Sequence, residues 1–309
     1  MALTLIEASK LNSGDVLKST VIEAFARESD ILRVLPFEDI QGGGVTYNRE
    51  TTLPGIAFRG VNESFTPSVG VVNPLTDALS ILGGEVDVDR FIIMTRGVSV
   101  RASHVMMKVK ALAAQWTTSF IKGDSTSDPR QFDGLQARLL GNQLIPAGST
   151  AGGAALSLST VDQAIDQTYD PTHIILSKAL RRRFQQAARN INVGGYIEFT
   201  TDEFGKPVTT YQGLPLLVAY SDNGGDEVLP FTEAAASGGN TATSMYVVSL
   251  GAERLTGIQN GTIDVRDLGE LQQNAVTFRT RVEWYQGIAL YHPRAATRVN
   301  QIGNLPIVA

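Results

Sequence analysis

Cysteine is absent from this sequence, and histidine is rare, with 3 residues among 309. Without cysteine the chain cannot form disulfides, use a thiolate nucleophile or build a cysteine-based zinc site. None of the histidines has a second histidine or a glutamate at metal-binding spacing. We therefore interpret His104, in a helical pattern, and His173, at the start of an apolar strand, as structural residues.

Charge and long apolar runs are also scarce. Charged residues make up 18% of the chain, and the net charge of −5 argues against a tightly held nucleic acid, which requires a basic excess. The longest apolar run, LPLLVAY at 214–220, has the length of a strand and not of a membrane span. The N-terminus has no basic segment before a long apolar core, so we expect no signal peptide.

What the sequence does contain is an ordered series of structural patterns. Residues 3–28 have apolar residues at helical spacing, interrupted near Gly14. Residues 41–85 alternate without helical period and have few large apolar residues, which indicates a long two-stranded excursion without a core of its own. Such a hairpin is marginal in water, so we expect it to rest on another surface.

The clearest helix follows a strand predicted at 86–95. Apolar residues recur at helical spacing over 97–122, and Gly123 stands where a helix commonly ends. A compact α+β unit is predicted after the spacer at 146–155, with Ser159 as the N-cap of its first helix. Residues 275–291 alternate between an apolar and a charged face, and we expect the long helix to cover the apolar face.

The stretch FIKGDSTSDPRQFDGLQARL at 120–139 places several oxygen-bearing side chains directly after Gly123. Counted from Asp124, an EF-hand loop would have Pro at position six, where Gly is needed, and would lack the final bidentate Glu. A phosphate loop would need a second Gly followed by Lys. We therefore interpret the stretch as a helix end followed by Asx-type turns at Asp124 and Asp128.

Other catalytic patterns are equally poor. There is no GxSxG nucleophile elbow, and the glycines at 42–44 lack the following helix of a dinucleotide site. Arg181, Arg182 and Arg183 form the one basic cluster, but three successive residues fan over roughly 200° of a helix and cannot all face one ligand. They could contact acidic residues of a neighbour or nucleic acid, or lie on a solvated helix start. We predict no enzyme, no metal and no cofactor.

In the order of its parts, the chain resembles the tailed-bacteriophage major capsid proteins with the Hong Kong 97-like fold. The end of the long helix is similar to the family pattern FxxGD…P…GL, and GLPL at 213–216 is similar to its GLPV strand. The closing run FRTRVEWYQGIALYHPRAATRV looks like the family's strand into RxxG…xPxA. Each motif is unspecific alone, and the agreement in order and spacing across the whole chain carries the resemblance.

The resemblance implies an α+β fold with five parts. They are an N-terminal arm (1–40), an extended E-loop hairpin (41–85), a peripheral P-domain (86–150) that includes the spine helix (97–122), an axial A-domain (151–254), and returning P-domain strands with a C-terminal tail (255–309). It also implies a shell subunit that forms hexamers and pentamers of an icosahedral phage head around double-stranded DNA. Such a head would assemble in the host bacterial cytoplasm, with a portal and possibly a decoration protein as partners.

Two departures from the family sharpen this expectation. Some members crosslink covalently through an E-loop lysine, but residues 41–85 contain no lysine, so we expect a non-covalent shell. Some members carry a fused scaffolding segment, for which residues 1–40 are too short, so we expect a separate scaffolding protein. The candidate contacts between subunits are the charged residues Arg49, Glu50, Arg59, Glu63, Arg181, Arg182 and Arg183.

Three other interpretations remain open from the sequence. An encapsulin-like nanocompartment would share the fold and enclose cargo enzymes. A metal-dependent hydrolase would use Asp124, Asp128 or Asp133. Another phage structural component, such as a decoration or tail protein, would form no closed shell by itself.

Overall fold

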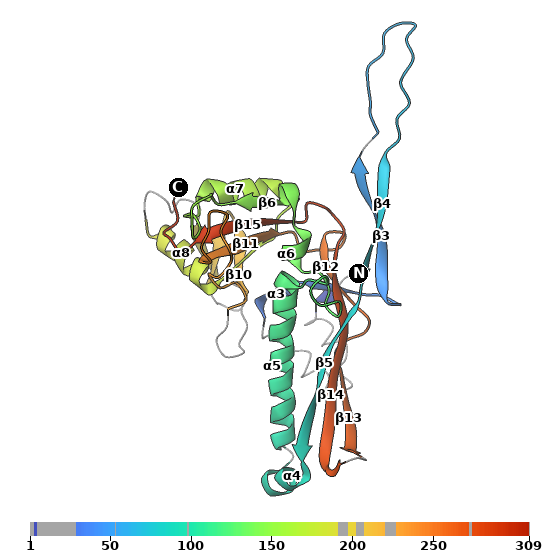
Figure 1. Cartoon of the computed structure of the whole chain (residues 1–309), viewed down its shortest axis with the longest axis vertical. Helices are drawn as coiled ribbons and strands as arrows, with labels where there is room; N and C mark the ends of the chain where they lie inside the picture. The colour runs from blue at the N-terminus through green and yellow to red at the C-terminus, as the bar shows by residue number, and fades with distance from the viewer. Residues whose placement is uncertain are drawn as a thin grey trace.

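The computed structural model describes residues 3–4, 29–52, 54–97, 99–190, 197–201, 207–219, 227–271 and 274–308. The described chain has three parts, as Figure 1 shows: a long body of strands with one long helix beside them, a compact unit at one end of that helix, and a thin excursion that projects beyond both. None of the described helices is long and apolar enough to cross a membrane.

The elements follow one another along the chain as helices and strands of very different lengths. The helices are α3 (Asp30–Val34), α4 (Arg90–Arg96), α5 (Ser99–Lys122), α6 (Leu135–Arg138), the 3₁₀ turn η1 (Gly141–Gln143), α7 (Leu158–Gln167) and α8 (Lys178–Ala188). The strands are β1 (Leu3–Thr4), β2 (Pro36–Asp39), β3 (Gly44–Thr52), β4 (Val71–Ala78), β5 (Ser80–Asp89), β6 (Leu144–Pro146), β7 (His173–Leu176), β8 (Ile197–Thr201), β9 (Pro207–Tyr211), β10 (Leu214–Val218), β11 (Ala242–Val248), β12 (Leu255–Gln259), β13 (Asp264–Leu271), β14 (Asn274–Leu290) and β15 (Ala296–Gly303).

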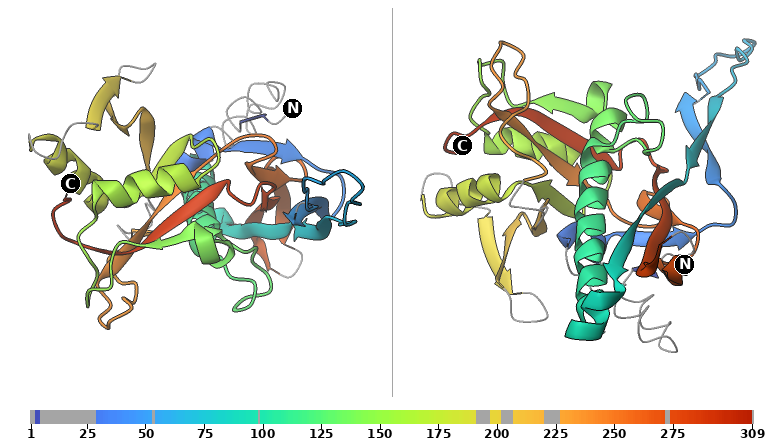
Figure 2. Two further views of the ribbon diagram at one scale, coloured as in Figure 1. Left: turned by 90° about the horizontal axis from the view of Figure 1, so that it is seen from above. Right: turned by 60° about the horizontal axis from the view of Figure 1, so that its bottom comes forward.

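The body is built around β14, which is 17 residues long and pairs antiparallel with β5, β12 and β13. The helix α5 packs against β5 and β14, and Figure 2 shows it running along the strands. Its buried side includes Val109, Trp116 and Phe120, so the helix predicted for 97–122 is confirmed, with Gly123 directly after its end. As expected from the alternation in β14, the apolar side chains Val282 and Trp284 are buried.

Two tryptophans at the centre of this core satisfy their indole N–H groups inside the protein. Trp116 Nε1 donates to Gln286 Oε1 at 2.9 Å, and Trp284 Nε1 donates to Gln259 Oε1 at 3.2 Å. Phe37 packs against Trp284 with ring centroids 5.3 Å apart. Because a buried N–H without a partner is costly, these two glutamines fix the mutual orientation of α5, β12 and β14.

The compact unit has its own seven-stranded sheet, in the order β6-β15-β11-β7-β10-β9-β8, and its own apolar core beneath α7 and α8. The first strand, β6, precedes the spacer at 146–155, and β15 comes after the chain has returned through the body. The chain thus enters this sheet twice. The division into five domains remains an expectation, and in this topology β6 and β15 lie with the compact unit.

The excursion is a separate two-stranded sheet of β3 and β4, paired antiparallel from Gly44 with Ala78 to Thr52 with Val71. Its tip, residues 54–70, lies outside regular secondary structure. In Figure 1 the excursion extends away from both the body and the compact unit. The structure therefore places a core-free hairpin inside the segment 41–85, as the sequence predicted.

Three local predictions need correction or fall outside the described residues. The strand predicted at 86–95 is wrong in its second half, because Asp89 accepts a hydrogen bond from Phe91 N at 2.7 Å and caps the helix α4. The N-cap of α7 is Ser157 and not Ser159, since the Ser157 hydroxyl accepts the bond from Ser159 N. The helix predicted within 3–28 lies outside the described residues, apart from Leu3–Thr4, which forms β1.

Candidate intersubunit contact surface

The tip of the excursion carries the largest set of uncovered apolar side chains in the described chain. Phe58 and Ile56 are fully exposed, at 107% and 98%, and the tip contributes three more large apolar residues: Val61, Phe65 and Val69. We call these five side chains the tip cluster. Isolated exposed apolar residues are ordinary, but a cluster on a projecting loop marks a surface that becomes covered by a partner.

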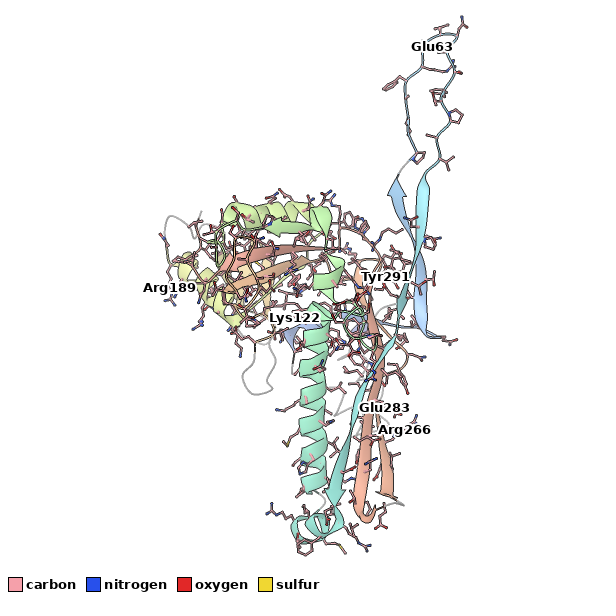
Figure 3. The ribbon with its side chains drawn as sticks, viewed as in Figure 1. Glu63, Lys122, Arg189, Arg266, Glu283 and Tyr291 are labelled. Atoms are coloured by element: carbon pink, nitrogen blue, oxygen red, sulfur yellow. The ribbon has the colours of Figure 1, made fainter. Side chains whose placement is uncertain are left out.

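Two of the predicted contact residues shape this tip. Arg59 donates from Nη1 to the Glu63 carbonyl at 3.0 Å, and the Glu63 carboxylate accepts from Gly60 N at 2.7 Å. The Arg59 guanidinium also lies 5.5 Å from the centre of the Phe65 ring. The Arg59 and Glu63 side chains thus hold a tight turn at the end of the loop, where Figure 3 labels Glu63, and both remain exposed.

Arg49 is engaged within its own chain. Its Nη2 donates to the carbonyl of Leu290 at 2.6 Å, a contact that spans 241 positions of the sequence. Sequence spacing alone could not indicate this partner, since β3 and the end of β14 meet only in the folded chain. The side chain of the neighbouring Glu50 lies outside the described residues.

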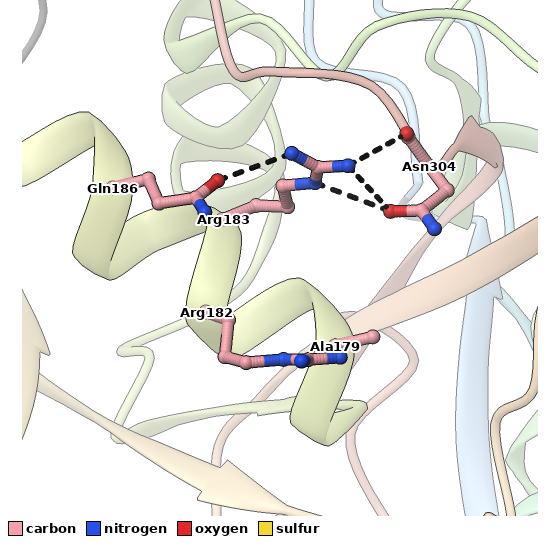
Figure 4. A pocket seen from close by; sticks show the side chains of 5 residues that line it. All are labelled: Ala179, Arg182, Arg183, Gln186 and Asn304. Atoms are coloured by element: carbon pink, nitrogen blue, oxygen red, sulfur yellow. Dashed lines mark hydrogen bonds between the residues drawn. The ribbon is translucent and has the colours of Figure 1, made fainter.

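The three arginines of α8 separate in the structure, as the helical fan predicts. Arg182 is exposed, whereas Arg183 donates to the side-chain and backbone oxygens of Asn304 and to Gln186, as Figure 4 shows. Arg182 and Arg183 line a shallow cavity of about 160 Å³. Arg181 is half-buried, with its Nε buried and without a hydrogen-bond partner, and Arg183 holds the chain after β15. Arg182 is therefore the exposed arginine of this cluster and the best placed of the three to reach a neighbour.

The stretch that follows α5 forms a series of turns. Asp124 accepts from Thr126 N at 2.9 Å and from the Ser127 hydroxyl at 2.6 Å, and Asp128 accepts from Arg130 N at 3.1 Å. These are the predicted Asx-type turns, and the hydrogen bond from Ser127 holds the pKa of Asp124 below its usual range. Across the described chain, no group of three or more acidic or histidine side chains is placed to hold a metal.

A second exposed apolar surface lies at the opposite end of the body and was missed in the sequence. Phe91 and Met94 of α4 are 73% and 75% exposed, and α4 buries none of its residues. The strand predicted at 86–95 concealed this surface, because successive side chains of a strand point to opposite faces of the sheet and do not form one apolar surface. The Asp89 cap was the signal that could have revealed it.

His173 gives the compact unit a dependence on pH. Burial lowers the pKa of His173 from 6.5 to about 4, so the folded state keeps the imidazole neutral. We expect the contribution of His173 to stability to be constant above about pH 6.5 and to be lost as the pH falls from there to about 4, a change of roughly 3 kcal/mol at most. Chemical denaturation at a series of pH values measures this.

Two variants separate the effect of His173 from general acid sensitivity. His173→Gln should flatten the stability profile between pH 6.5 and pH 4, the window bounded by its free and folded pKa. His104→Gln, at an exposed position of α5, should leave the profile unchanged. An identical acid loss in all three proteins would show that the imidazole of His173 is not its source.

Comparisons with known proteins agree with this architecture. A family profile described as major capsid protein GP7 matches residues 13–162. Among solved structures, the chain resembles the SrpI encapsulin of Synechococcus elongatus at 16% identity and a TM-score of 0.65, with 90% of this chain and 89% of that chain covered. No curated protein sequence matches.

Two further structures come from a phage and from a GTA particle. A protein of Mycobacterium phage Bobi is 15% identical with a TM-score of 0.60, covering 91% of this chain and 90% of that one. The capsid of a native GTA particle is 11% identical with a TM-score of 0.63, covering 89% and 91%. The predicted α+β fold is therefore confirmed: this chain has the Hong Kong 97-like capsid fold, and residues 13–162 match the family profile of major capsid protein GP7.

Proposed function

We propose that this chain is the structural, non-enzymatic subunit of a self-assembling capsid shell. The observation that carries the proposal is the tip cluster, five large apolar side chains on a projecting hairpin that its own chain leaves uncovered. A second copy of the chain would remove this surface from water, and a closed shell supplies such a copy to every subunit. The family match over residues 13–162 supports the same conclusion.

The arrangement of the shell follows from the resemblance. Hexamers and pentamers would form around the compact unit, the long bodies would meet at local threefold positions, and the excursion would lie across a neighbouring subunit. The exposed residues among the predicted charged contacts, Arg59, Glu63 and Arg182, are then candidates to face that neighbour.

We expect the subunits to be held without covalent crosslinks. Residues 41–85 contain no lysine, so the excursion offers no amine for an isopeptide bond. Boiled particles should run as a single band at the subunit mass of 33.2 kDa in denaturing electrophoresis. A ladder of higher bands would contradict this.

The shell would enclose double-stranded DNA as a phage head, without sequence-specific binding. A separate scaffolding protein and a portal would be its partners, with a decoration protein as an optional one. The virion would be its location and the host bacterial cytoplasm its place of assembly. A second candidate is a nanocompartment that encloses enzymes, favoured by the likeness to the encapsulin at a TM-score of 0.65. The sequence match to the GP7 profile favours the phage head.

Electron microscopy of the purified protein tests the proposal directly. We expect closed shells or capsomers in negative stain, with or without a co-expressed scaffolding protein. Particles from infected cells should contain nuclease-protected double-stranded DNA, whereas a co-purifying cargo enzyme would identify the nanocompartment. A protein that remains monomeric at all concentrations and with scaffolding protein present would overturn the proposal.

A further inference from the structure

The base of the excursion is fastened to the body by polar side chains that share one face of the hairpin. Tyr47, Arg49 and Asp77 lie on this face, because Val45 pairs with Asp77 and Tyr47 with Leu75 in the β3–β4 ladder. The Tyr47 hydroxyl lies 3.0 Å from Asp77 Oδ2 and 2.9 Å from the Leu290 carbonyl, and Arg49 donates to the same carbonyl. Strand β3 is thereby attached to the end of β14, and Asp77 of β4 shares the same Tyr47 hydroxyl.

An ion pair links the same face to α6, the short helix that follows α5 in the chain. Arg138 Nη1 lies 2.8 Å from Asp77 Oδ1, with the two side chains only 16% and 11% exposed. Arg138 also donates from Nε to the Asp133 carbonyl at 2.8 Å, which fixes its guanidinium to the segment that leaves α5. This is the most enclosed ion pair between the excursion and the rest of the described chain, and a partly buried pair is weakened little by salt.

Aromatic packing closes the other side of this contact. The rings of Tyr47 and Tyr291 meet edge to face with centroids 4.9 Å apart, and Tyr291 donates to Glu38 at 3.0 Å. Burial and the nearby Asp77 carboxylate raise the pKa of Tyr47, so its hydroxyl stays protonated and remains a donor. Tyr47, Arg49 and Asp77 thus each have a polar partner on β14 or α6, although Arg49 Nε is buried without one.

We propose that Asp77 and Arg138, together with Tyr47 and Arg49, form a latch that sets the direction of the excursion relative to the long helix. The nine residues of β3 extend roughly 30 Å at about 3.3 Å per residue, so a small rotation at the base displaces the tip by several ångströms. The four side chains are positioning residues, which act through the backbone of the hairpin. Their importance for assembly rests on the proposed function, but their effect on the direction of the excursion does not.

Because the chain has no cysteine, single cysteines can be introduced for spin labelling, and the distance between the excursion and the long helix can be measured. Spin labels on Asn48→Cys, at an exposed position of β3, and Met107→Cys, at an exposed position of α5, report the distance between the excursion and the long helix by pulsed electron resonance. The full chain is measured unassembled, or diluted into unlabelled protein, so the result does not depend on shell formation. We expect one narrow distance distribution in the parent protein.

Breaking the latch should widen that distribution. Arg138→Met and Asp77→Asn should each broaden it about twofold, and the double variant should resemble the single ones because both residues act through one contact. Arg90→Met, which removes the exposed ion pair with Glu270 at the opposite end of the body, is the matched control and should change nothing. Circular dichroism confirms that each variant is folded.

The proposal is overturned if folded Asp77→Asn and Arg138→Met keep the narrow distribution of the parent. Should Arg138→Met fail to fold, Tyr47→Phe and Asp77→Asn test the same contact from the hairpin side. A parent that forms no shells but responds as expected would contradict the proposed function alone. Shells from a parent whose latch variants show no change would contradict the latch alone.

Discussion

Replacing Phe58 and Phe65 together by serine is expected to leave a folded chain that no longer forms shells. The two side chains are 107% and 62% exposed in the single subunit, so their loss removes no packing from either core. Covering an exposed phenylalanine contributes about 1.5–3 kcal/mol, and in a shell this contribution recurs at every subunit contact. The melting temperature of the isolated subunit should therefore stay constant while light scattering and negative-stain microscopy show the loss of large particles.

A matched variant distinguishes apolar contact from damage to the loop. Phe58→Leu with Phe65→Leu keeps large apolar side chains at the same positions and should retain assembly, because volume-conserving apolar replacements are tolerated best. It also removes the contact between Arg59 and the Phe65 ring, so retained assembly would show that this contact is dispensable. Normal shells from the serine variant would mean that the tip cluster is not an intersubunit surface.

The elements predicted correctly from the sequence are those whose residue pattern lies within the element itself. Helical periodicity and Gly123 predicted α5 almost to its last residue, and the alternation over 275–291 predicted the long strand β14. The failure of the Asp124 stretch to match any ligand motif was informative in the same way, since its turns are made by residues two or three positions apart.

The features that could not be predicted from the sequence depend on contacts between residues far apart in the chain. Arg49 binds a carbonyl 241 positions away, and Arg183 binds Asn304 across 121 positions. Both are candidate contacts with a neighbouring subunit, and no pattern in the sequence indicated these partners within the same chain. The placement of β15 beside β11 is equally non-local, since strand pairing depends on the fold and not on spacing.

The tip cluster was present in the sequence but was not recognised as the candidate contact. Residues 41–85 lack a core of their own, and the contacts predicted in that segment are its charged residues. The physical argument favours the apolar ones, because exposed charges are already well solvated and contribute little on contact. An apolar residue in a segment that cannot bury it is the stronger signal for a partner.

The second large effect is expected from Gly134→Ala at the junction that follows the long helix. A Cβ at Gly134 would lie 2.6 Å from the Ser119 carbonyl oxygen and 2.7 Å from Gly123 N, both backbone atoms at the end of α5. Gly134 N also donates to the Gly123 carbonyl at 2.8 Å, so the two segments cannot move apart without losing this bond. We expect a loss of about 3 kcal/mol, the upper end of typical overpacking costs.

This loss should appear as a melting temperature lower by roughly 5 °C in calorimetry, given the size of the chain. Gly43→Ala is the matched control, since a Cβ there meets nothing within 4 Å and the backbone does not require glycine. It should change the melting temperature by a degree or less. Equal melting temperatures for the two variants would show that the backbone at Gly134 moves to accept the Cβ without loss of stability.

A selective loss at Gly134 would instead establish that the helix end and the segment leading to Arg138 form one rigid unit. The latch requires such a unit, because Arg138 can orient the excursion only if its own backbone is fixed.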